Sequence, residues 1–82
     1  MAFTVEKALA GTWIEVAQGP GNATITSSFS GVYWAITTGS APSFDGGHSA
    51  KIGENVSLVL VTGESLFIKG NGNAYVTADV PV

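Results

Sequence analysis

The last third of the chain, residues 56–80, consists of three short apolar runs separated by two glycine-containing breaks. The breaks lie at residues 62–64 and 70–73, and the runs are rich in Val, Leu, Ile, Phe and Tyr. Runs of this composition between such breaks are typical of antiparallel strands joined by tight turns. We therefore predict a three-stranded meander at this end of the chain.

The rest of the sequence continues the pattern, because most of its glycines fall between apolar runs as turn residues do. Strands are expected at residues 12–17, 22–29, 32–37 and 50–52, with a turn at 18–21 and a long irregular loop at 38–49. Residues 3–10 fit a strand, an arm or one helical turn. No window has apolar residues at helical spacing, so we expect little or no helix.

These expectations define one fold class. We predict a single all-β domain over residues 1–82, with residues 1–11 as a possible N-terminal arm. It would be a small antiparallel β-sandwich or jelly-roll-like barrel of about seven to eight strands.

Alternation along the strands assigns each side chain to one of two faces, because neighbouring strand residues point to opposite sides. The residues of the predicted core face are Ile14, Val16, Ile25, Phe29, Val32, Trp34, Ile36, Val56, Leu58, Leu60, Leu66, Ile68, Val76, Ala78 and Val80.

The opposite faces also carry large apolar residues, although only 11% of the chain is charged. Aromatic residues are enriched where proteins meet. We therefore expect subunit contacts there, and a further contact through the long loop, since loops of that length are usually functional or mobile. Incidental exposure and a register shifted by one residue are the alternatives. The candidate interface residues are Trp13, Tyr33, Phe44, Val59, Val61, Phe67 and Tyr75.

Charge and composition exclude several classes of function. The net charge is -3, and three lysines without an arginine cannot form the basic stripe that nucleic acid requires.

No window approaches the ~20 apolar residues of a membrane span. The first residues lack the features of a signal peptide, so we expect synthesis in the cytoplasm without export. No cysteine is present, which excludes disulfides and thiolate zinc sites.

The long loop carries the residues closest to a catalytic set. His48 lies near Asp45, Ser43 and Ser49, the residue types of a hydrolytic triad. They share one glycine-rich loop and lack the rigid strand-to-helix turn of hydrolases, so a polar loop with a turn at 45–47 is the alternative. The acidic residues lie apart from one another in the sequence, whereas a calcium site needs several carboxylates at close spacing. We expect no enzymatic activity, no metal and no cofactor.

Carbohydrate binding is an alternative function, because Trp13, Tyr33, Trp34 and Tyr75 offer aromatic platforms. Trp34 alternates with the core, and no cluster of Asp, Asn and Arg accompanies the other three in the sequence. A lectin-like module, for example a receptor-binding tip, is therefore the second hypothesis.

A series of short motifs begins at residue 46: Gly47-His48, Gly-Glu pairs at 53–54 and 63–64, Lys69-Gly70-Asn71-Gly72, and a closing Val76-Thr77. This order resembles small β-sandwich virion proteins of tailed bacteriophages and prophages. Such proteins decorate heads, form head fibres or build neck and tail appendages, often as trimers. The resemblance implies a structural protein of the virion, a capsid decoration or appendage subunit, whose partners are copies of itself and other virion proteins.

Overall fold

The computed structural model describes residues 2–27, 32–43 and 47–82, and all regular structure in these ranges is β-strand. The strands are β1 (Phe3–Ala10), β2 (Ile14–Gln18), β3 (Gly21–Ser27), β4 (Val32–Thr37), β5 (His48–Ala50), β6 (Asn55–Leu60), β7 (Ser65–Lys69) and β8 (Asn71–Ala78). The all-β prediction with its strand number is confirmed. Within these ranges no helix is long and apolar enough to cross a membrane.

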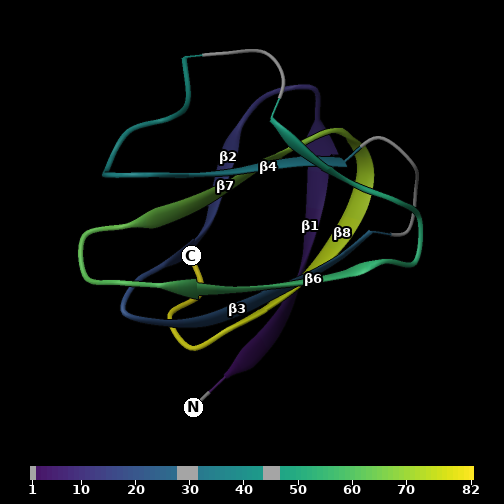
Figure 1. Ribbon diagram of the computed structural model, residues 1–82. Coiled ribbons are helices and arrows are strands. Elements are labelled where there is room, and N and C mark those ends of the chain that lie inside the picture. Colours follow the sequence, from purple (N-terminus) through teal and green to yellow (C-terminus); the bar gives the residue numbers. More distant parts are fainter. Residues whose placement is uncertain (1, 28–31, 44–46) are drawn as a thin grey trace.

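The strands form two four-stranded antiparallel sheets that pack face to face (Figure 1). Sheet A has the order β1-β8-β3-β6, and sheet B has the order β2-β7-β4-β5. Among the connections, only the one from β4 to β5 joins neighbours within a sheet. This order, in which the chain passes repeatedly between the two sheets, is the jelly roll.

The predicted C-terminal meander is wrong in its pairing. The three strands exist as β6, β7 and β8, but β6 pairs with β3, β7 pairs with β2 and β4, and β8 pairs with β1 and β3. The connection at 61–64 and the single residue Gly70 each join strands of different sheets, so both short connections cross from one sheet to the other.

The N-terminal segment is a strand and not an arm. β1 pairs with β8 in continuous register from Phe3 opposite Ala78 to Ala10 opposite Asn71. The 32–37 strand is found with its predicted bounds as β4, whereas the short strand expected at 50–52 is found as β5, two residues earlier. Phe29, Phe44 and Asp45 lie outside the described residues.

One hydrophobic core lies between the sheets. Its largest fully buried apolar side chains are Ile25, Leu66, Ile68, Val16, Val32 and Val76. The other predicted core residues of the described ranges belong to this cluster or pack against it partly buried, except Val80. Val80 is exposed because it lies in the C-terminal segment that runs along the edge of β2.

That C-terminal segment pairs with the edge of sheet B. The Gln18 amide donates to the Val80 carbonyl at 2.9 Å, and the Val82 amide donates to the Val16 carbonyl at 3.1 Å. Ala17 and Pro81 form the bridge between these two bonds. An unpaired sheet edge is a template for strand addition, so this segment protects part of β2.

Both Gly-Glu pairs form the same kind of turn. At residues 51–54 and 61–64, the amide of the fourth residue donates to the carbonyl of the first, at 3.0 and 3.1 Å. The glutamate carboxylate in turn accepts the first residue's amide, from Lys51 at 2.9 Å and from Val61 at 2.8 Å. Gly53 and Gly63 supply the positive φ of the third position. The two glutamates are therefore turn-forming residues.

Candidate functional site

The residues predicted for subunit contacts are divided among three surfaces. Trp13, Tyr33 and Phe67 belong to the outer face of sheet B, whereas Tyr75 and Val59 belong to the outer face of sheet A, as strand alternation dictates. Val61 lies in the turn between β6 and β7 and Phe44 lies outside the described residues.

The outer face of sheet B has an aromatic centre that is largely covered. Phe67 points away from the core, since both neighbours in β7 are core residues, and it lies opposite Glu15 and Ala35 in the adjacent strands. It is nevertheless only 7% exposed. The expectation that Phe67 meets solvent is therefore wrong.

Beside Phe67, the side chains of Lys69 and Trp13 pack against each other on this face. The Lys69 ammonium lies 5.7 Å from the centroid of the half-buried Trp13 ring, a cation–π arrangement. Tyr33 is opposite Lys69 in the next strand and is partly exposed. Among the described residues of this face, Tyr33 is therefore the most accessible aromatic side chain, while Phe67 is buried and Trp13 is half-buried.

The outer face of sheet A is an array of short polar side chains. One row crosses all four strands, and two side-chain hydrogen bonds link its hydroxyls, at 2.7 Å between β1 and β8 and at 3.3 Å between β3 and β6. The row consists of Thr4, Thr77, Thr24 and Ser57.

The next row contains the exposed tyrosine of this face. Across the four strands it consists of Glu6, Tyr75, Thr26 and Asn55. The Thr26 hydroxyl donates to Asn55 Oδ1 at 2.6 Å. The Tyr75 hydroxyl hydrogen-bonds the Glu6 carboxylate, and this bond, with the negative charge of Glu6, raises the pKa of Tyr75. Tyr75 is thus surrounded by polar groups that sequence spacing could not place beside it.

Four exposed valines lie in β6, in the turn that follows it and in the C-terminal segment. The turns at 18–21 and 61–64 and the C-terminus lie toward the same end of the sandwich (Figure 1). The turns touch closely, since a Cβ added to Gly19 would lie 1.9 Å from the Val61 carbonyl oxygen. We call this group the valine end. Its members, with exposures from 38% to 72%, are Val59, Val61, Val80 and Val82.

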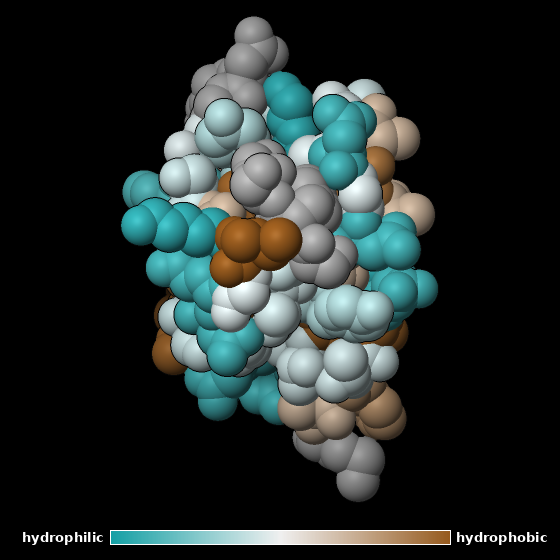
Figure 2. Space-filling model, turned by 90° about the vertical axis from the view of Figure 1, so that its right-hand side faces the viewer, coloured by the Kyte–Doolittle hydropathy of each residue, from teal (hydrophilic) through white to brown (hydrophobic). Residues whose placement is uncertain are grey.

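The opposite end of the sandwich has a different character. Figure 2 shows it to be mostly hydrophilic, with hydrophobic residues in separate patches. Ile52, in the turn between β5 and β6, is 65% exposed. Strand alternation predicts Val59 and Val61 as interface residues but assigns Val80 to the core, because alternation does not reveal where a strand leaves its sheet.

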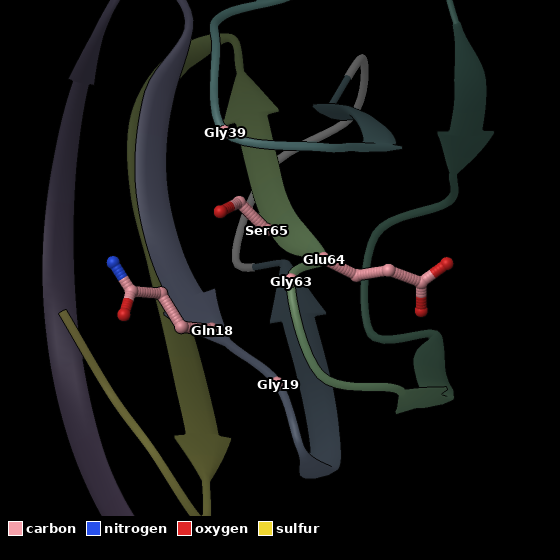
Figure 3. Close-up of a pocket in the computed structure, with 6 residues that line it drawn as sticks. All are labelled: Gln18, Gly19, Gly39, Gly63, Glu64 and Ser65. Carbon is pink, nitrogen blue, oxygen red and sulfur yellow. The ribbon is translucent and has the colours of Figure 1, made fainter.

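A depression of about 240 Å³ adjoins the valine end. Its lining consists of Gln18, Gly19, Gly39, Gly63, Glu64 and Ser65. The Glu64 side chain points away from those of Gln18 and Ser65 (Figure 3), and its carboxylate accepts the Val61 amide. No acid–base pair therefore converges in the depression, which is shaped mainly by glycine backbone.

Of the residues of the hypothetical triad, the described structure directs His48 and Ser49 to opposite sides of sheet B. The His48 ring stacks on the Trp34 ring, with centroids 4.5 Å apart and planes at 29°. Ser49 is the next residue of β5 and therefore points to the other side of the sheet. Asp45 lies outside the described residues. Across the described ranges, no three His, Asp or Glu side chains are grouped to hold a metal ion.

Comparison with known proteins returned no match: no protein-family model, no curated protein and no solved structure is significantly similar to the chain.

Proposed function

We propose that the chain is a non-enzymatic structural subunit of a bacteriophage virion, a capsid decoration or appendage protein. It associates through the valine end with copies of itself and with other virion proteins. The motif resemblance of residues 46–80 supports the virion setting. The jelly-roll strand order supports it more generally, because viral capsid domains are among the proteins that use this fold.

The observation that carries the proposal is the exposure of four valines at one end of the domain. Single exposed apolar residues are normal on a protein surface, whereas a gathering of them marks an interaction site. Covering apolar surface contributes roughly 25 cal/mol per Å². A partner at this end therefore gains from every valine that it removes from water.

The acidic groups of this end are directed to their own backbone. Asp79 accepts the Asn22 amide at 2.9 Å, as Glu64 accepts the Val61 amide at 2.8 Å. Each carboxylate thus keeps a hydrogen-bond partner when a second protein covers the surface, which lowers the cost of desolvation. The adjacent depression can receive a side chain of the partner.

The size of the domain predicts weak association of isolated subunits. An interface of standard size buries about 800 Å² on each partner, which is about a fifth of the 4394 Å² that this chain exposes. A contact between the valine end and a different surface of the next copy is heterologous, and such contacts form a ring when the rotation from copy to copy closes. The trimer that the resemblance implies is one such ring, and repeated contacts in a particle strengthen it.

Incorporation into particles tests this proposal. Phage particles are purified from a host that encodes the chain, and their proteins are quantified by mass spectrometry. The test variant is Val59→Thr with Val61→Thr, which keeps β-branched residues but removes apolar surface, and Ile52→Thr at the opposite end is the matched control. We expect wild type and control in the particles, and at least about tenfold less of the double variant, a change of ~1.4 kcal/mol. Particles that lack the wild-type chain, or that hold the double variant at wild-type level, would refute the proposal.

A further inference from the structure

We propose that the outer face of sheet A binds a neutral saccharide, with Tyr75 as the stacking platform. This inference goes beyond assembly and concerns a surface separate from the valine contacts of the proposed function, although Val59 borders both. It rests on the aromatic ring, on the polar groups that the register places around it and on the charge of the face.

Tyr75 has the position of a platform on the outer face of sheet A. It lies on β8, a central strand of sheet A, and is 44% exposed. Its hydroxyl is directed to the Glu6 carboxylate, which lies opposite it on the neighbouring strand β1. The face of an aromatic ring is electron-rich. It therefore attracts the polarised C–H groups on the apolar side of a pyranose.

The polar groups around the ring are fixed in advance by bonds to one another. Thr26 bonds Asn55, Thr4 bonds Thr77, and Glu6 bonds Tyr75. Groups that are already ordered lose less entropy when a ligand binds.

These bonds leave hydrogen-bonding capacity for a ligand. A hydroxyl has one donor and two acceptor sites, a carboxylate has about four acceptor sites, and an amide has two donors besides its oxygen. When Asn55 Oδ1 accepts from Thr26, the Asn55 amide nitrogen still has two hydrogens to donate. The face thus provides both donors and acceptors, which is what sugar hydroxyls need.

The charge of the face selects neutral sugars. The charged residues that its strands direct outward, or that follow them directly, are Glu6 in the Tyr75 row and Asp79 after β8, and both are acidic. Lys51 and Glu54 lie in the turn before β6 and carry opposite charges. Lys7 alternates with Glu6 and points to the opposite side of β1, and Lys69 belongs to sheet B. An acidic sugar would meet like charge without a compensating cation from the described part of this face, so uronates, sialosides and sugar phosphates are disfavoured.

The flatness of a sheet face predicts modest affinity. A ligand on a flat surface is buried less completely than in a pocket, so we expect Kd on the order of 1 mM for a trisaccharide. Display of many copies on one particle would raise the effective affinity without new contacts.

An NMR titration of the ¹⁵N-labelled chain tests the inference. The probes are maltotriose, cellotriose and mannotriose, with sialyllactose as the acidic comparison. We expect at least one neutral trisaccharide to shift backbone signals of β1, β8 and β3 saturably, and sialyllactose to leave them unchanged. Tyr75→Ala should weaken binding at least about tenfold, whereas Tyr75→Phe, which keeps the ring, should retain most of it.

The matched control is Tyr33→Ala, which removes a tyrosine of similar exposure from the other sheet and should bind as wild type does. The amide spectrum of each variant shows whether it is folded. The inference is wrong if no neutral trisaccharide causes a saturable shift up to about 20 mM, roughly twentyfold above the expected Kd. It is equally wrong if Tyr33→Ala weakens binding as much as Tyr75→Ala does.

Discussion

Tyr75 and Phe67 illustrate what strand alternation can and cannot predict for a single residue. Alternation predicts an outward direction for both, and the sheet register agrees. It does not predict exposure, because exposure depends on the neighbouring strands: Phe67 is buried on its face, and Tyr75 is open beside Glu6. Glu6 and Tyr75 are far apart in the sequence, so only the pairing of β1 with β8 brings them together.

The Tyr75–Glu6 bond predicts a pH dependence that one substitution removes. The bond favours the protonated phenol and raises the pKa of Tyr75 above its ordinary value of 10.0. A raised pKa stabilises the fold below the ordinary value, and this contribution is lost as the pH rises through the folded-state pKa. Glu6→Gln should therefore lower the pKa of Tyr75, as measured from the tyrosine ¹³Cζ chemical shift against pH. An unchanged pKa in that variant would show that Glu6 does not hold the hydroxyl.

At the level of strands and turns, the sequence predicts the elements far better than their pairing. Glycine breaks and β-rich runs identify the strands because these signals are local. The choice between a hairpin and a crossing to the opposite sheet is not local. The single residue Gly70 separates β7 from β8, which reads as a tight turn but is a corner between the sheets.

Two glycines at the valine end should respond differently to alanine. Gly63 has φ +90° and open space around it, so Gly63→Ala should cost only the backbone penalty of about 1 to 2 kcal/mol. Gly19 lies against the Val61 carbonyl, and an added Cβ would come within 1.9 Å of backbone oxygen. Gly19→Ala must displace a turn and should cost about 3 kcal/mol or more.

Urea denaturation followed by tryptophan fluorescence measures both free energies of unfolding. If Gly19→Ala is no less stable than Gly63→Ala, the two turns do not pack as closely as described.

The hydrophobic core of the whole molecule is small compared with its exposed surface. A chain of this length buries only about two thirds of the surface that it exposes when unfolded, and five residues of the core cluster in the described ranges are alanines. Sequence patterns predict the two-sided character of the sheets but treat their outer apolar residues as one interface. The fold separates them into a covered aromatic face, a polar face around Tyr75 and the valine end.

Sedimentation equilibrium over a range of concentrations measures whether the valine end mediates association. We expect the apparent mass of the wild-type chain to rise above the 8.3 kDa of the monomer as concentration increases. Ile52→Thr should associate in the same way, whereas the Val59→Thr, Val61→Thr double variant should stay monomeric over the same range. A wild-type chain that stays monomeric up to about 1 mM, or a double variant that associates as strongly as wild type, would show that the valine end does not mediate association.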